Sequence, residues 1–195
     1  MYLYGASGHA KVIIEILELI NIQVTGLFDD NPEITGLLDY KVRRFNPDLL
    51  KQESLIISIG DNATRKKVAE LFDDSIFIQA IHPSAVISKR ASIGNGTVVM
   101  ANATINSEAK IGSHVIINTC ASIDHDCIIG DYAHISPNAT LAGNVTIGEG
   151  AWIGAGAVII PGVKVGKWSV VGAGAVVLKN VQDEATVVGN PTRIL

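Results

Sequence analysis

The sequence predicts a small α/β domain with a half-Rossmann-like βαβ arrangement, followed by a parallel β-helix and a short C-terminal tail. Two patterns carry this prediction. Strand and helix patterns alternate over residues 1–80, and an aliphatic residue recurs at every sixth position over residues 81–180. Residues 181–195 leave the second pattern. The composition is 48% apolar but only 5% aromatic, so aliphatic side chains must fill the core.

The composition also argues against several classes of protein. The formal net charge is −4, so neither nucleic acid nor an anionic membrane surface is an expected partner. Two cysteines, Cys120 and Cys127, give no disulfide framework, which favours a reducing compartment. The N-terminus has no signal-peptide pattern and no segment reaches 18 continuous apolar residues, so we expect a cytoplasmic protein without membrane insertion.

The first 80 residues read as strands alternating with helices, which predicts a small parallel sheet. We expect strands over residues 2–4, 23–30, 54–62 and 75–81. The helices are expected over residues 9–20 and 63–72, where the first has apolar residues at helical spacing. Ligands of such sheets bind beyond the carboxyl ends of the strands, which here carry the loops at residues 5–9, 29–31 and 60–62.

The first of these loops is a glycine turn at a helix N-terminus, where unpaired N–H groups and the helix dipole favour a phosphate. Asp30 follows Gly8 by about 20 residues, the separation at which a carboxylate reaches a ribose hydroxyl. The pattern is G-x-x-G and not G-x-G-x-x-G, so the glycines could instead serve only a tight turn. The residues expected to bind a nucleotide or nucleotide sugar are Ser7, Gly8, His9, Asp29, Asp30, Gly60 and Asn62.

A repeat of six residues dominates the rest of the chain. All sixteen positions spaced by six from Ile87 to Val177 are aliphatic, which chance would give in about one frame in 10⁵ at this composition. A small residue stands two positions earlier, as Cys127 does before Ile129, and glycine often follows. This period fits a chain that runs straight, turns a corner and repeats, which is a parallel β-helix. Each stacked aliphatic contributes about 1.5–3 kcal/mol when fully buried.

These repeats resemble the left-handed β-helix acyltransferases. The segments GASGH, FDDNP, IGDN, IHPSA and VVGNPTRIL narrow the resemblance to the bacterial nucleotide-sugar and sialic-acid acetyltransferases, closest to the UDP-4-amino-sugar N-acetyltransferases of bacillosamine synthesis. The resemblance implies 18 residues per coil and about five coils. It also implies acetyl-CoA as the donor and a nucleotide-linked amino sugar as the acceptor. The sites would lie between the subunits of a homotrimer.

The repeat predicts where the polar residues of segment 121–136 point. His125 stands two positions after an inward aliphatic, so it lies at a corner, with Asp124 and Asp126 on either side. His134 lies between two inward residues and points out of a flat face. The two histidines are nine residues apart, half of an 18-residue coil, so within one chain they lie on opposite sides of the prism. Across a trimer interface they could face each other.

Acetyl transfer to an amine needs a base, and a positioned histidine with its pKa near neutrality contributes about 10²–10⁴-fold. His125 is the candidate. The related enzymes have His-Glu here, whereas this chain has the shorter Asp126, so either Asp126 or Asp124 could orient the ring. The resemblance also implies Asn118 as a polar active-site residue and the Gly143 amide as a donor beside the thioester. The positions it implies for coenzyme A are His134, Gly143, Ala155 and Ala173.

Several alternatives stay open. The reaction could be O-acetylation of sialic acid or N-acetylation of a GDP-perosamine-type sugar, because Asp29 and Asp30 do not distinguish uridine from guanine. The pathway that the enzyme serves is equally open, and a non-catalytic sugar-nucleotide sensor is a further alternative. A zinc hydratase would need three converging histidines, but His114, His125 and His134 occupy different repeat positions, so no metal is expected. We expect His114 at the surface, and Trp152 at the subunit interface in preference to the alternative of a wall of the coenzyme A channel.

Overall fold

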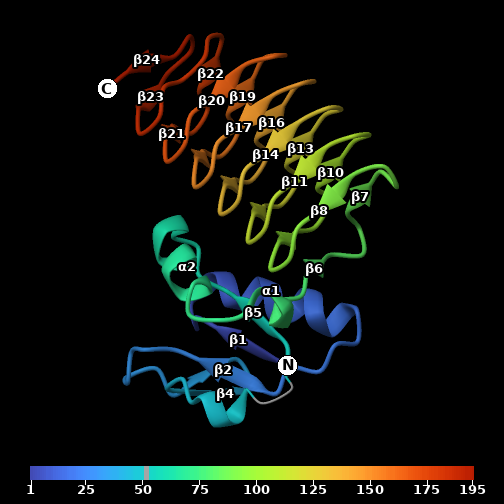
Figure 1. Cartoon of the computed structure of the whole chain (residues 1–195), viewed down its shortest axis with the longest axis vertical. Coiled ribbons are helices and arrows are strands. Elements are labelled where there is room, and N and C mark those ends of the chain that lie inside the picture. Colours follow the sequence, from blue (N-terminus) through green and yellow to red (C-terminus); the bar gives the residue numbers. More distant parts are fainter. Residues whose placement is uncertain (51–52) are drawn as a thin grey trace.

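The computed structural model describes residues 1–50 and 53–195, and it shows two parts stacked along the long axis of the molecule (Figure 1). The N-terminal part is a small sheet with two helices, and the β-helix rises from it towards the C-terminus. Within the described residues, no helix combines the length and apolarity needed to cross a membrane. The predicted fold class, an α/β domain followed by a parallel β-helix, is confirmed.

Within residues 1–50 and 53–80, the N-terminal domain consists of five short strands and two helices. They are β1 (Tyr2–Tyr4), α1 (Gly8–Leu19), β2 (Gly26–Phe28), β3 (Gly36–Leu37), β4 (Tyr40–Arg43), β5 (Leu55–Ile57) and α2 (Asn62–Ala69), with 3₁₀ turns at Pro47–Leu49 and Asp74–Ile76. The strand order is β3-β4-β2-β1-β5, and all pairs are parallel except the β3–β4 hairpin. Both helices therefore begin beyond the carboxyl ends of parallel strands, β1 and β5.

The β-helix has three faces, and each strand pairs in parallel with the strand 18 residues later, as Thr104 does with Ser122. The first face holds β7 (Val86–Ile87), β10 (Thr104–Ile105), β13 (Ser122–Ile123), β16 (Thr140–Leu141), β19 (Val158–Ile159) and β22 (Val176–Val177). The second face holds β8 (Ser92–Ile93), β11 (Lys110–Ile111), β14 (Ile128–Ile129), β17 (Thr146–Ile147) and β20 (Lys164–Val165). Three repeats thus make one coil.

The third face is the longest and ends in the C-terminal tail. It holds β6 (Ala80–Ile81), β9 (Val98–Val99), β12 (Ile116–Ile117), β15 (His134–Ile135), β18 (Trp152–Ile153), β21 (Val170–Val171), β23 (Thr186–Val188) and β24 (Arg193–Ile194). Its last pair, β23–β24, is antiparallel. The outer side chains of Val98 and Ile116 form one buried apolar cluster with Ile13 of α1. The N-terminal domain therefore covers the early coils of this face and leaves the later coils uncovered.

The interior of the β-helix is filled as the repeat predicts. The repeated aliphatic residues from Val99 to Val177 are at most 4% exposed, and Cys127 is completely buried in one of the small inward positions. Ile87 and Ile93, at the start of the β-helix, are partly buried. The ladder of stacked aliphatics is therefore the main stabilising element, and its register decides which side chains can point outward.

The prediction that residues 75–81 form a last strand of the N-terminal sheet is wrong. A 3₁₀ turn covers Asp74–Ile76, because the Asp73 carboxylate accepts a hydrogen bond from the Ser75 amide at 2.9 Å and so favours a turn. Phe77 makes only a single bridge to β5, and β6 pairs with β9 of the β-helix instead. The β3–β4 hairpin was not predicted, because its first strand has only two residues.

Candidate active site

The three predicted loops meet at the carboxyl edge of the N-terminal sheet, beyond β1, β2 and β5. Asp29 supports the glycine turn there: its Oδ2 accepts a hydrogen bond from the Ala6 amide at 2.7 Å, and its Oδ1 accepts one from the Asn31 amide at 2.9 Å. Asp30 accepts a hydrogen bond from the Tyr4 hydroxyl at 3.0 Å. Burial and this carboxylate raise the pKa of Tyr4 to about 12. Both aspartates thus also hold the loops in place.

The glycines of these loops have different roles. Gly5 has φ +106°, and a Cβ there would lie 2.6 Å from a side-chain carbon of Ile59, so the tight turn itself requires this glycine. A Cβ at Gly8 or at Gly60 would meet nothing within 4 Å. Ser7, at the N-cap of α1, is exposed and makes no side-chain cap bond. The start of α1 and the Gly60 loop are therefore open to an approaching ligand.

The two remaining loop residues are less accessible. His9 is half-buried, and its Nε2 has no hydrogen-bond partner among the described residues. Burial, with the positive charge of Arg65 acting in the same direction, lowers the pKa of His9 to about 4, so it is neutral at pH 7. Asn62 is only 7% exposed and both its polar atoms are engaged, with Nδ2 donating to the Gly150 carbonyl at 3.1 Å and Oδ1 accepting from Arg65 at 2.8 Å.

His125 lies in the turn between β13 and β14, at the corner between the first and second faces. Its Nδ1–H donates to Oδ2 of Asp126 at 2.7 Å, whereas Asp124 accepts from the His125 backbone amide at 2.8 Å and from Asn106 at 2.9 Å. Asp126 therefore holds the ring and Asp124 holds the backbone. The hydrogen bond to Asp126, helped by the charge of Asp124, raises the pKa of His125 above its usual value.

The free nitrogen of the His125 ring faces the next coil. A Cβ on Gly143 would lie 2.7 Å from Nε2, and the adjacent Asn144 amide donates to the His125 carbonyl at 2.9 Å. Because the hydrogen bond to Asp126 keeps the proton of a neutral ring on Nδ1, Nε2 carries the lone pair. The side chain of His125 is 59% exposed in the single chain. A basic nitrogen thus projects from the corner beside a glycine backbone.

His134 is held in one tautomer on the third face. The Thr119 amide donates to Oδ1 of Asn118 at 2.8 Å, which directs Nδ2 of Asn118 towards Nε2 of His134, 3.1 Å away. Since Nδ2 can only donate, Nε2 must accept, and the ring proton is on Nδ1. Burial first, then the charges of Arg65 and His9, lower the pKa of His134 to about 3, while the Gly60 carbonyl acts in the opposite direction.

A cavity of about 390 Å³ begins at His134 and continues over the later coils of the third face. His134 stacks on Trp152 with ring centroids 5.7 Å apart, and the indole N–H donates to the Ser136 hydroxyl at 2.9 Å. Ala155 and Ala173, one coil apart, line its other side. Small side chains at successive coils leave room for an extended ligand that runs parallel to the β-helix axis.

The predicted residues therefore form two groups in one chain. His125, Asp126, Asp124 and Gly143 lie at the corner between the first and second faces. His134, Asn118, Ala155 and Ala173 lie on or beside the third face, which is the opposite side of the prism. The resemblance implies Gly143 as one of the coenzyme A contacts. In the structure it lies beside His125 and does not line the cavity of its own chain.

The expectation that His114 lies at the surface is wrong. Its side chain is 3% exposed, and its ring packs between Phe77, at 4.4 Å, and Tyr132, at 5.3 Å between ring centroids. Burial lowers the pKa of His114 to about 4. Sequence reasoning also missed Arg65, which is 1% exposed beneath this cluster. Among the described residues, no group of three or more His, Cys, Asp or Glu side chains could hold a metal ion.

Comparison with known proteins covers both parts of the chain. Residues 1–72 match the PglD N-terminal domain, and residues 108–143 and 144–179 match the bacterial transferase hexapeptide family, which consists of six repeats. A UDP-N-acetylbacillosamine N-acetyltransferase from Bacillus subtilis is 42% identical over 112 residues, which are 50% of this chain and 49% of that protein. The aligned segment thus spans only about half the length of this curated relative.

Several solved structures match over the whole chain, among them the following two. PerB from Caulobacter crescentus, in complex with CoA and GDP-perosamine, is 38% identical with a TM-score of 0.93 and covers 100% of this chain and 96% of its own. The acetyltransferase domain of PglB from Neisseria gonorrhoeae, in complex with acetyl coenzyme A, is 33% identical with a TM-score of 0.91 and covers 100% and 98%. The chain therefore belongs to the hexapeptide-repeat family of sugar N-acetyltransferases.

Proposed function

We propose that this protein transfers an acetyl group from acetyl-CoA to the amine of a nucleotide-linked 4-amino sugar, with His125 as the general base. The observation that carries the proposal is the geometry of the His125 corner. Oδ2 of Asp126 accepts a hydrogen bond from Nδ1–H of His125 at 2.7 Å, so the lone pair is on Nε2, which faces Gly143. The acceptor is proposed to be a nucleoside diphosphate sugar. PerB was solved with GDP-perosamine, and the Bacillus subtilis relative is named for a UDP-linked sugar.

The proposed reaction is a direct transfer. Nε2 of His125 takes a proton from the sugar ammonium, and the freed amine attacks the thioester carbonyl carbon. The negative charge that develops on the carbonyl oxygen is stabilised by the Gly143 N–H. The C–S bond then breaks, the extra proton on the attacking nitrogen passes to the departing coenzyme A thiolate, and the neutral amide remains. Asp126 stabilises the imidazolium while His125 carries the transferred proton.

The cavity on the third face is the proposed place for the donor. Ala155 and Ala173 have small side chains at positions one coil apart, so an extended pantetheine chain can lie against them. His134 and Trp152 close the end nearest the N-terminal domain, where the open Gly8 and Gly60 loops would hold the nucleotide. A donor of this kind is found in the cytoplasm, which is the proposed compartment.

The proposed site is completed by a second subunit of a homotrimer. His125 and the cavity lie on opposite sides of one prism, so a single chain cannot bring the base to a thioester bound in its own cavity. A neighbouring copy related by three-fold symmetry can present its His125 corner to that cavity. This arrangement also shields the ring, which the isolated chain leaves 59% exposed.

The substrate is tested by release of coenzyme A thiol from acetyl-CoA with a panel of UDP-, GDP- and dTDP-linked 4-amino sugars and free sialic acid. Turnover with one nucleotide-linked amino sugar is expected. Turnover only with sialic acid would replace the proposal with O-acetylation. Tight nucleotide-sugar binding without any thiol release would indicate a non-catalytic sensor.

The shared site is tested by mixing subunits. His125→Ala removes the base, and Ala155→Trp fills the donor cavity, so each variant alone should be inactive. In a co-assembled trimer, the intact cavity of a His125→Ala subunit can face the intact His125 of an Ala155→Trp subunit. Partial activity should therefore return. Mixed trimers that form but stay inactive would show that base and donor cavity act within one chain.

A further inference from the structure

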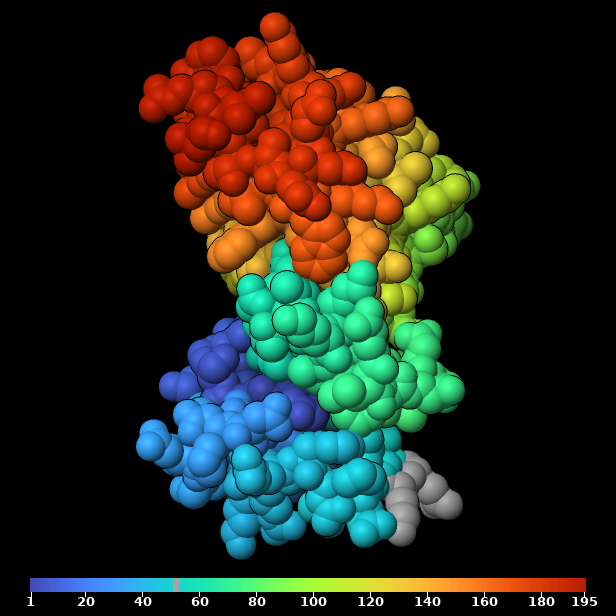
Figure 2. Space-filling model, turned by 60° about the vertical axis from the view of Figure 1, so that its left-hand side comes forward, coloured from blue at the N-terminus to red at the C-terminus, as the bar shows by residue number. Residues whose placement is uncertain are grey.

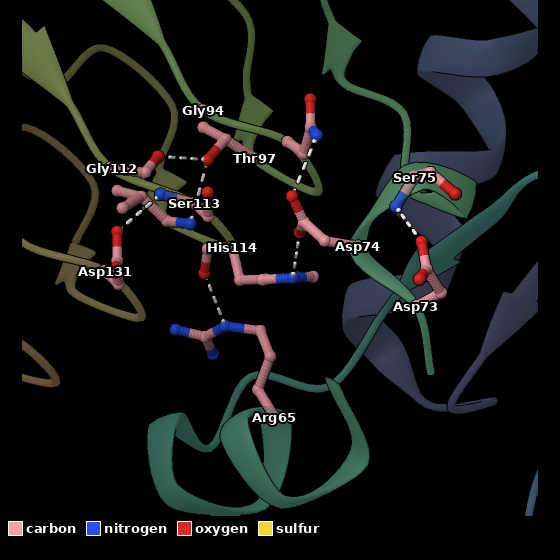
Figure 3. Close-up of polar contacts among 12 residues, drawn as sticks. Arg65, Asp73, Asp74, Ser75, Gly94, Thr97, Gly112, Ser113, His114 and Asp131 are labelled. Atoms are coloured by element: carbon pink, nitrogen blue, oxygen red, sulfur yellow. Dashed lines mark hydrogen bonds and ion pairs between the residues drawn. The ribbon is translucent and has the colours of Figure 1, made fainter. Parts of the chain in front are cut away.

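Arg65 is a buried cation between the two parts of the molecule. It projects from α2 and is only 1% exposed, and its hydrogen-bond partners in the described part of the chain include no carboxylate. Figure 3 shows its side chain rising from α2 towards the β-helix, where Nε donates to the His114 carbonyl at 2.8 Å. Removing this charge from water costs free energy of desolvation, which its hydrogen bonds inside the protein must offset.

All five N–H groups of the guanidinium are used. Nη1 donates to the carbonyls of Ile59 at 3.0 Å and Gly60 at 3.1 Å, and Nη2 donates to Oδ1 of Asn62 at 2.8 Å. Two of those acceptors lie in the loop between β5 and α2, and the third, Asn62, is the first residue of α2. The other two are β-helix carbonyls, of His114 and of Tyr132 at 2.7 Å. One rigid planar group therefore fixes this loop to the β-helix.

The β-helix side of this contact is a column of equivalent corner positions, which we call the corner column. Each member lies one coil after the previous one and has positive φ: Gly96, His114, Tyr132, Gly150 and Trp168. α2 contacts four of them. Arg65 bonds to His114 and Tyr132, Asn62 bonds to Gly150, and the Lys66 ammonium lies 5.5 Å from the Trp168 ring.

The corner column runs along the edge of the third face, the face that carries the donor cavity. Tyr132 and Gly150 each stand two residues before an outward side chain of the third face, His134 and Trp152 respectively. The loop held by Arg65 and Asn62 is thus fixed to the two coils that carry His134 and Trp152 at one end of the cavity. Figure 2 shows α2, in teal, in direct contact with the orange coils above it. The position of Gly60 relative to the cavity is consequently fixed.

We propose that Arg65 is a positioning residue that holds the acceptor loop, residues 59–62, at a fixed distance from the acetyl-transfer site without touching either substrate. This inference rests on the function proposed above. Lysine has at most three donors and no planar fork, so it cannot satisfy the five acceptors that Arg65 does. A misplacement of about 1 Å in such a site costs about 10²-fold in rate.

The test compares Arg65→Lys with wild type in steady-state kinetics, varying each substrate separately. We expect kcat/KM for the nucleotide amino sugar to fall by about 10–100-fold, with the KM for acetyl-CoA changing by less than about twofold. The matched control is Lys66→Met, on the next position of α2. Lys66 contacts Glu149 and Trp168 of the β-helix but not the acceptor loop. The kcat/KM and KM values of the Lys66→Met variant should therefore equal those of wild type for both substrates.

Each outcome decides a different question. Wild-type protein without turnover on any acceptor overturns the proposed function and this inference with it. An active wild type and a folded Arg65→Lys variant with unchanged acceptor kinetics overturns the inference alone, as does an equal loss for both substrates. If Arg65→Lys does not fold, Asn62→Ala decides: it removes one loop acceptor and the Gly150 bond, and a selective loss for the acceptor substrate is expected. Unchanged kinetics in that variant overturns the inference.

Discussion

Replacing Gly150 by alanine tests how closely the corner column is packed. Gly150 has φ +64°, and a Cβ there would overlap Cε3 of the Trp168 ring. The left-handed conformation alone costs a non-glycine residue about 1–2 kcal/mol. Overpacking against the ring adds about 1–3 kcal/mol. Gly150→Ala should therefore lower the free energy of unfolding by about 2–5 kcal/mol.

Gly156 provides the matched control. Its φ is +65°, but a Cβ there would meet nothing within 4 Å, so Gly156→Ala should cost only the backbone contribution of about 1–2 kcal/mol. Urea unfolding followed by far-UV circular dichroism, at one protein concentration because association changes apparent stability, gives both values. In a second comparison, Trp168→Ala should remove most of the extra loss caused by Gly150→Ala. Equal losses in the two glycine variants would refute the reasoning, since they would mean that Trp168 moves away freely.

Three further predictions concern the proposed reaction. His125→Ala should lower kcat by about 10²–10⁴-fold with an unchanged elution volume in gel filtration, and near-normal turnover would remove His125 as the base. Asp126 raises the pKa of His125, so Asp126→Asn lowers that pKa; because the base works unprotonated, the acid limb of the kcat–pH profile should move to lower pH. A limb that stays in place would contradict the role of Asp126. Gly8→Val, into open space, should raise the acceptor KM without lowering the unfolding midpoint, and an unchanged KM would argue against acceptor binding at the start of α1.

The β-helix could be predicted from the sequence because its rule is local and repeats. An aliphatic at every sixth position fixes the inward direction, so the outward direction of His134 and the corner position of His125 follow without knowledge of any partner. The same reasoning correctly placed Cys127 inside. It also predicted that the two histidines lie on opposite sides of one chain.

The contact between the two parts could not be predicted in this way. Arg65 and His114 look like surface residues in the sequence, because the partners that bury them come from another part of the chain. A signal was nevertheless present: the 18-residue steps from His114 lead to Tyr132, Gly150 and Trp168, so three of these four equivalent positions carry a ring, which is unusual in a chain with 5% aromatics. The 3₁₀ turn at Asp74–Ile76 was missed for a local reason, since the Asp73 carboxylate accepts a hydrogen bond from the Ser75 amide and so favours a turn over a strand.

The corner column also constrains how the length of such a protein can change. α2 spans the coils from His114 to Trp168, and removing 18 residues between them would leave the ladder of aliphatics intact but exchange the residues that Asn62, Arg65 and Lys66 meet. Among the contacts that the described residues make, none joins α2 to a coil beyond Trp168. Insertion or loss of whole coils is therefore compatible with the docked N-terminal domain only towards the C-terminal end, where the donor cavity could be lengthened without moving the acceptor loop.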